Sequence, residues 1–146
     1  MIRLTRAGEY AVRGLVYLAG QSSEKLTLIS EIARAENVSA SFLAKIFQNL
    51  ARAGMVKSHR GVSGGVSLAV SPEQITLRQI IEAVEGPIAL NKCLKRSEAC
   101  SRAPVCKLSP FWREAQAGLL GVLEATTLGK LNGNGGVKRV PPAAGQ

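Results

Sequence analysis

The chain has 146 residues and a formal net charge of +9 at pH 7. This length suggests one domain, and the excess of lysine and arginine favours a polyanion as partner, either nucleic acid or an acidic membrane surface. No apolar run is long enough to cross a bilayer, and the N-terminus lacks the apolar core of a signal peptide. We therefore expect a cytoplasmic protein.

Apolar residues at helical spacing predict three helices early in the chain, over residues 5–19, 29–36 and 40–53. Thr5 and Ser39 stand where N-caps of the first and third helices belong, and Gly54 follows the third as its C′ glycine. Residues 26–28 are expected to form a short strand. The tight connection between the second and third helices is typical of a helix-turn-helix, whose second helix lies in the major groove of DNA.

A basic hairpin is expected directly after these helices. Residues 55–60 and 66–69 have the pattern of two strands, joined by a glycine-rich turn over 61–65. A hairpin in this position makes the unit a winged helix, so the expected partner is double-stranded DNA and not a membrane. Arg60 at the hairpin base could enter the minor groove, and the glycines would let the backbone approach phosphates closely.

The second half of the chain is also expected to be helical. A short helical turn is predicted at 72–74, and Thr76 caps a helix over 77–85 that ends at Gly86. Ser109 and Pro110, as N-cap and first helical residue, open a long helix that ends near residue 126. Its apolar stripe is wider than one small lobe could cover, so we interpret it as a dimerisation helix, with packing on its own domain as the alternative. The stripe consists of Phe111, Trp112, Ala115, Leu119, Val122 and Leu123.

The predicted fold class is mainly α with a small β-hairpin wing: a winged helix-turn-helix DNA-binding domain plus a long dimerisation helix. The expected boundaries are a DNA-binding domain over 1–70, a connecting helix over 71–90, a cysteine loop over 91–107, a dimerisation helix with a short terminal turn over 108–131, and a disordered tail over 132–146 that is rich in glycine and proline.

The three cysteines, Cys93, Cys100 and Cys106, all lie in one short loop. Their odd number argues against a disulfide framework, and thiolates suit zinc and iron–sulfur clusters. Either group takes four ligands, so a fourth ligand would have to come from elsewhere. The alternative is three unrelated free thiols. Because the only histidine, His59, lies on the wing and no catalytic constellation is evident, we do not expect an enzyme.

Several short motifs together resemble the Rrf2 family of bacterial winged-helix regulators, with its IscR-like, NsrR-like and RirA-like members. The resemblance covers about residues 1–131 and is carried by Arg3-Leu4-Thr5, Tyr10-Ala11, Ser41-Phe42-Leu43, the run from Leu50 to Val56, Arg60-Gly61 with Gly64-Gly65, the three cysteines, Phe111-Trp112 and Thr127-Leu128. It implies a cytoplasmic bacterial homodimer that binds a pseudo-palindromic operator, most simply as a repressor. It also implies an iron–sulfur cluster held by the three cysteines, through which nitric oxide, iron supply or redox state is sensed. We favour a [4Fe–4S] cluster, with [2Fe–2S] as the alternative.

The chain departs from some members of the family at sites that matter. IscR-like members have a histidine as fourth cluster ligand where this chain has Ser109, and a glutamate in the recognition helix where it has Ala44. In some NsrR-like members a carboxylate from the partner subunit completes the cluster, and Glu9 is the matching residue. The resemblance therefore favours an NsrR-like or RirA-like regulator, with Glu9 of the partner subunit as a candidate ligand.

The predicted DNA contacts follow from the winged helix. Base edges in the major groove would be contacted by Ser39, Ser41, Phe42, Lys45 and Gln48. Phosphates would be contacted by Arg52 and Lys57 and approached by the backbone at the wing glycines Gly61, Gly64 and Gly65, and Arg60 would enter the minor groove. Two alternatives keep the fold and change the function. One is a cluster-free, thiol-based redox regulator, and the other is a winged helix that binds a protein partner.

Overall fold

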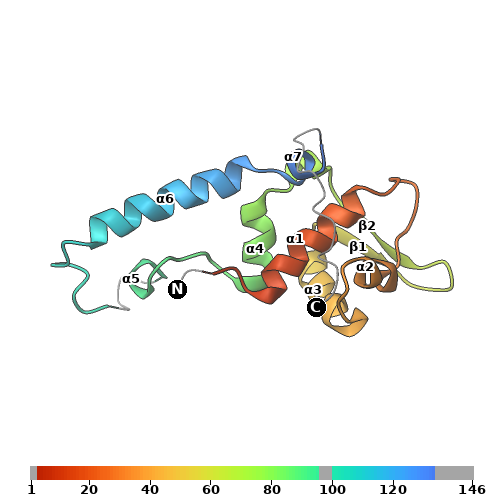
Figure 1. Cartoon of the computed structure of the whole chain (residues 1–146), viewed down its shortest axis with the longest axis horizontal. Helices are drawn as coiled ribbons and strands as arrows, with labels where there is room; N and C mark the ends of the chain where they lie inside the picture. Colours follow the sequence, from red (N-terminus) through yellow and green to blue (C-terminus); the bar gives the residue numbers. More distant parts are fainter. Residues whose placement is uncertain (1–2, 96–99, 134–146) are drawn as a thin grey trace, which may run out of the picture.

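The computed structural model describes residues 3–95 and 100–133 of the chain (Figure 1). Along these residues the elements are α1 (Arg6–Ala19), α2 (Ile29–Ala35), α3 (Ala40–Arg52), β1 (Val56–His59), β2 (Gly65–Leu68), the 3₁₀ helix η1 (Pro72–Gln74), α4 (Leu77–Glu85), α5 (Lys92–Lys95), α6 (Ser109–Ala125) and α7 (Leu128–Asn132). The prediction of a mainly helical fold with one β-hairpin is confirmed.

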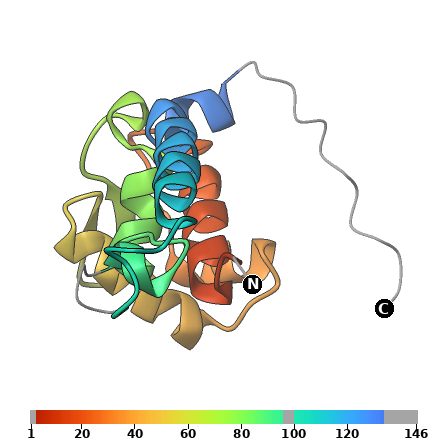
Figure 2. The ribbon, with the colours of Figure 1, turned by 90° about the vertical axis from the view of Figure 1, so that its left-hand side faces the viewer.

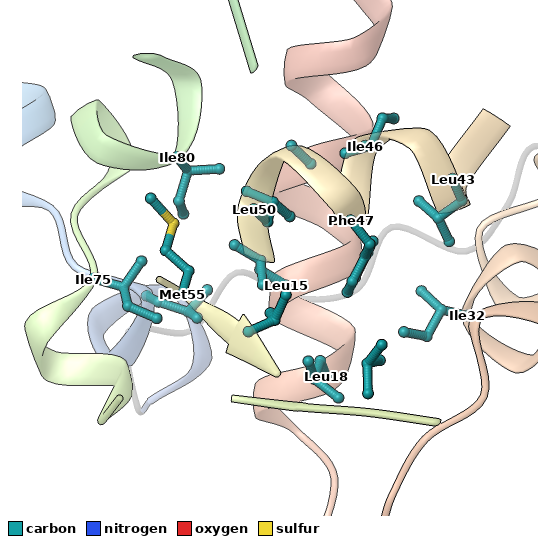
Figure 3. Close-up of a cluster of buried hydrophobic side chains, with 14 of the residues drawn as sticks. Leu15, Leu18, Ile32, Leu43, Ile46, Phe47, Leu50, Met55, Ile75 and Ile80 are labelled. Atoms are coloured by element: carbon teal, nitrogen blue, oxygen red, sulfur yellow. The ribbon is translucent and has the colours of Figure 1, made fainter. Parts of the chain in front are cut away.

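The core of the molecule is built on α1, which packs against α3 and α4 and also contacts α2 and α7. Figure 3 shows Leu43, Phe47 and Leu50 of α3 gathered with Leu15 and Leu18 of α1 in one buried cluster. Full burial of a Leu, Ile or Phe side chain contributes roughly 1.5–3 kcal/mol. These contacts therefore fix which face of α3 is buried and which face is left to solvent.

The connection between α2 and α3 is set by local hydrogen bonds. Asn37 adopts a left-handed conformation with φ of 54°, and the N–H of Val38 donates to the carbonyl of Ala33 at 2.9 Å, as in a Schellman motif. The hydroxyl of Ser39 then accepts from the N–H of Phe42 at 3.2 Å, so the predicted N-cap of α3 is confirmed. The chain turns sharply here, which gives the helix-turn-helix its compact shape.

The hairpin has the predicted place and pairing, since β1 runs antiparallel to β2 with Val56 opposite Leu68 and His59 opposite Gly65. Val56 and Val66 are buried and attach the hairpin to the core. The expected strand over 26–28 is wrong. Only Thr27 pairs with Val66, through two hydrogen bonds of 3.0 and 2.8 Å, because α2 begins two residues later.

The second half of the chain leaves this core and returns to it. Helix α6 extends away from α1, α2 and α3, with α5 near its far end (Figure 1), and the view toward that end shows α1 and α4 behind α6 (Figure 2). The chain returns through α7, where fully buried Leu128 donates its N–H to the carbonyl of Ile75 at 2.7 Å. An isolated antiparallel β-bridge between Thr76 and Thr127 joins the residue before α4 to the residue before α7.

Two expectations about helix ends need correction. Ser109 is the first residue of α6 and not its N-cap: Leu108 takes the cap position with helical dihedral angles, and no side chain of the described residues caps the helix. The expected tail begins too early, because Asn132 is the last residue of α7. The rest of that expected tail, residues 134–146, lies outside the described residues.

Candidate nucleic-acid interface and cysteine segment

The outer face of α3 carries four of the residues predicted to contact DNA. Because the buried residues of α3 face α1, the opposite face is exposed, and it presents Ser41, Lys45, Gln48 and Arg52. We call these four residues the recognition surface. Within residues 3–95 and 100–133, neither Lys45 nor Arg52 forms an ion pair with a carboxylate. The recognition surface therefore offers uncompensated positive charge beside hydrogen-bonding groups.

The other two α3 candidates have structural tasks at the start of the helix. Ser39 is exposed and uses its hydroxyl as the N-cap. Phe42 is half-buried, and its ring meets the ring of Tyr10 edge-to-face at a centroid distance of 6.0 Å. Phe42 thus attaches the first turn of α3 to α1. Much of its ring packs within the domain, and only the rest is exposed to solvent.

The wing presents two exposed basic side chains, Lys57 and Arg60. His59 is also exposed and makes a 3.1 Å hydrogen bond to Ser67 of the paired strand. The turn is held by its glycines: a Cβ on Gly64 would collide with the carbonyl oxygen of His59, and one on Gly65 would lie 2.8 Å from the carbonyl oxygen of Thr27. From the sequence, we expected these glycines to allow close approach to phosphates. In the structure, glycine is required at both positions because a side chain would collide with backbone carbonyl groups of the same domain.

The cysteine segment, residues 91–107, combines a short helix with turns, and 91–95 and 100–107 of it are described. Cys93 lies on α5, which the sequence analysis did not predict. Cys100 and Cys106 each stand directly before a turn, and their carbonyls accept from the N–H groups of Ala103 and Ser109. All three cysteines are half-buried free thiols. Cys93 borders a hollow of about 430 Å³ together with Pro104 and with Arg113 and Gln116 of α6.

Side chains of α6 attach the cysteine segment to that helix. The N–H of Leu90 donates to Gln116 Oε1 at 3.1 Å. The Asn91 amide, oriented with its oxygen toward the indole of Trp112, accepts from Nε1 of that indole at 3.1 Å. These two hydrogen bonds join the start of the cysteine segment, and Leu90 directly before it, to α6.

The family model named Rrf2, described as an iron-dependent transcriptional regulator, matches residues 4–134 of the chain. The chain belongs to the Rrf2 family. It is accordingly a transcriptional regulator and not an enzyme, and DNA binding goes with this family. The winged helix described above is the architecture that the resemblance implied.

Relatives of this Rrf2 protein span nearly its whole length. It is 40% identical over 131 residues to protein aau3 of Rhizobium meliloti, covering 89% of this chain and 84% of that protein. It is 33% identical over 128 residues to the HTH-type transcriptional regulator NsrR of Halalkalibacterium halodurans, covering 87% and 88%. It also matches the solved structure of CymR, the global cysteine regulator of B. subtilis, with a TM-score of 0.74, 33% identity and coverage of 90% and 97%.

The three thiols of the Rrf2 protein do not form a three-donor site in the part of the chain that the structure describes. Among the described residues, no three side chains of Cys, His, Asp or Glu are close enough together to hold a metal ion. The donor set itself suits an iron–sulfur cluster, since it consists of thiols that are half-buried and free. Glu9 lies on the exposed side of α1, where its carboxylate pairs with Arg13 at 2.7 Å.

The predicted dimerisation stripe of α6 divides into two faces. Leu119 and Leu123 are half-buried and border a hollow of about 630 Å³ shared with Ile81 and Val84 of α4. Phe111 and Val122, by contrast, are 67% and 65% exposed. Trp112 is half-buried toward the cysteine segment, and Ala115 is exposed. Only Phe111, Ala115 and Val122 of the six residues predicted for dimerisation are therefore on the exposed face of α6.

The sequence analysis missed residues whose role depends on distant partners. The Ser109 side chain is 4% exposed, and its hydroxyl has no hydrogen-bond partner in the described part of the chain. Arg6 and Arg34 border a hollow at the start of α3. Neither feature has a local sequence signal, because each depends on how the helices pack.

Among residues 3–95 and 100–133, no helix combines the length and hydropathy that crossing a bilayer requires.

Proposed function

We propose that this Rrf2 protein is a homodimeric repressor that binds a pseudo-palindromic operator and senses redox state, nitric oxide or iron through an iron–sulfur cluster. Cys93, Cys100 and Cys106 would hold the cluster, and Glu9 of the partner subunit would supply the fourth ligand. A cluster supplies reactivity toward oxidants and nitric oxide and responds to iron supply. The observation that carries this proposal is the position of three half-buried free thiols on a segment whose Asn91 is hydrogen-bonded to Trp112 of α6.

The DNA part of the proposal rests on the exposed face of α3 and on the exposed wing residue Arg60, which directly follows β1. The recognition surface would contact base edges and phosphates in the major groove, and Arg60 would enter the minor groove. In a two-fold dimer, two such surfaces would face half-sites about one helical turn apart. Phe42 would act by holding the first turn of α3 on Tyr10.

Signal transmission would use contacts that are present in one chain. The cysteine segment contacts α6 through Gln116 and Trp112, and α6 packs against α4, which in turn packs against α1 and α3. If three thiols converged on one group, the segment would have to rearrange, because they do not converge in the described part of the chain alone. That rearrangement would change the placement of α6 and, in a dimer, the spacing of the two recognition surfaces.

The test is an anaerobic ultraviolet–visible spectrum of the full chain with iron and sulfide analysis. We expect a broad iron–sulfur absorption in the wild type, its loss in Cys106→Ser, and a weaker band in Glu9→Ala. Glu24→Ala is the matched control, since it removes another exposed carboxylate outside the proposed ligand set. Strict absence of iron and sulfide from protein produced and handled without oxygen would contradict the cluster.

A second candidate is a cluster-free thiol regulator. It is favoured by the similarity to the cysteine regulator CymR, and no three-donor metal site is present among the described residues. Two thiols would then be oxidised to a disulfide with loss of two protons and two electrons to an oxidant. Peptide mass spectrometry after treatment with hydrogen peroxide would detect that disulfide in an iron-free protein, and reversible loss of DNA binding would accompany it.

A further inference from the structure

A basic hollow opens where α1, α2 and α3 meet. Its volume is about 520 Å³, and its border includes Arg6 at the start of α1, Arg34 at the end of α2, and Asn37, Ser39 and Phe42 around the start of α3. None of the described residues that border it carries a carboxylate. The hollow therefore lies beside the recognition surface, at the turn of the helix-turn-helix, and is positively charged.

Arg6 is held in place by aromatic rings. Its guanidinium carbon lies 5.6 Å from the ring centroid of Phe42 and 5.7 Å from that of Tyr10, which are cation–π distances. Stacking uses the face of a guanidinium and leaves its N–H groups at the edge free to donate. A cation in the first turn of a helix opposes the helix dipole, so the charge of Arg6 does not favour α1 at this position.

Arg34 supplies the second cation from the other side of the hollow. It is exposed in the last turn of α2. In the described residues, neither Arg6 nor Arg34 has a carboxylate within ion-pair distance, whereas Arg13 is paired with Glu9 at 2.7 Å. Two guanidinium groups thus share one open hollow without a counter-charge from the described part of the protein.

We propose that this hollow binds a phosphate of the DNA backbone, with Arg6 and Arg34 as its donors. Guanidinium groups match the geometry of phosphate oxygens, and the first helix of a helix-turn-helix crosses the DNA backbone beside the groove. The contact would fix the depth and register of the recognition surface without selecting a sequence. This inference rests on the proposed function, since it needs the recognition surface in the major groove.

The test measures the salt dependence of binding to a mixed-sequence DNA duplex, followed by fluorescence anisotropy. The variants are Arg6→Gln and Arg34→Gln, and the matched control is Lys130→Gln, which removes one positive charge on α7. The slope of log K against log salt falls by about 0.9 for each phosphate that the protein no longer neutralises, and twice that in a dimer that carries the substitution in both subunits. Because the two arginines would share one phosphate, we expect the full decrease when both are replaced together, a smaller decrease in each single variant, and an unchanged slope in the control.

Thermal unfolding of each variant checks whether a folding defect explains the result. We expect Arg34→Gln to match the wild type, because Arg34 is exposed, and Arg6→Gln to unfold at a modestly lower temperature, because it loses its cation–π contacts, which are weak at an exposed site. An unchanged slope in Arg6→Gln and Arg34→Gln, with normal binding by the wild type, would overturn this inference and leave the proposed function in place. A wild type that bound no DNA at low salt would overturn both.

Discussion

The carboxylate of Glu85 accepts a hydrogen bond from the backbone N–H of Thr5 at 2.7 Å, and the Thr5 hydroxyl also donates to it. Glu85 is the last residue of α4, and Thr5 is the N-cap of α1. A negative charge at the N-terminus of a helix is favourable, because it complements the helix dipole and the free N–H groups. The contact joins the end of α4, where the chain leaves toward the cysteines, to the start of the central helix.

The first prediction concerns Gly8, whose lack of a side chain leaves room for the contact between Glu85 and Thr5. A Cβ at Gly8 would collide with the Glu85 carboxylate and lie 2.9 Å from a methyl group of Leu4. We expect Gly8→Ala to lower the free energy of unfolding by about 1–2 kcal/mol, although alanine is ordinarily the better helix former. The measurement is urea unfolding followed by circular dichroism.

The control for Gly8→Ala is the same substitution in a Glu85→Ala background. There the added methyl group meets no carboxylate, and we expect it to raise the free energy of unfolding by up to about 1 kcal/mol through helix propensity. Equal effects of Gly8→Ala in both backgrounds would show that Glu85 and Gly8 are not coupled.

The exposed face of α6 provides the second prediction. We expect Val122→Glu to convert the proposed dimer to monomers, because Phe111 and Val122 are exposed apolar residues on one face of α6, where a charge would be costly to bury. The control is Ala117→Glu, which is also exposed but points to another side of α6. Sedimentation velocity measures the result. A Val122→Glu variant that remained dimeric would place the interface elsewhere.

The third prediction separates base contacts from phosphate contacts. Gln48→Ala should reduce the preference for the operator over mixed-sequence DNA, since a good base contact contributes about 1–3 kcal/mol of discrimination. Lys57→Ala should weaken binding to both duplexes equally and lower the salt slope by about 0.9 per contact. Competition binding at several salt concentrations measures both. The reverse pattern would exchange the roles proposed for α3 and the wing.

The fourth prediction concerns the hydroxyl of Ser109. A buried hydroxyl without a partner destabilises the fold, so we expect Ser109→Ala to raise the free energy of unfolding of the metal-free protein by about 1 kcal/mol. The control is Ser30→Ala, at an exposed serine near the start of α2. Its change in the free energy of unfolding measures the effect of helix propensity without a buried hydroxyl. A Ser109→Ala variant less stable than the wild type would reveal a partner for this hydroxyl in the assembled protein.

The sequence by itself determined the features that depend on neighbouring residues. Thr5, Ser39, Thr76 and Thr127 each accept a backbone hydrogen bond from three residues later, and the apolar face of α3 follows from the spacing of its residues. These interactions are local, so the order of residues is enough to predict them.

The tertiary structure alone decided which distant groups meet. Ser109 is followed by Pro110 and looks like an N-cap, yet it enters the helix and its hydroxyl is buried. The α6 stripe divides because α4 packs under Leu119 and Leu123 and leaves Phe111 and Val122 uncovered. Glu85 meets Thr5, and Arg6 meets Phe42, across gaps in the sequence that no local pattern connects. Such contacts depend on the angles and distances at which helices pack, and helical periodicity does not contain that information.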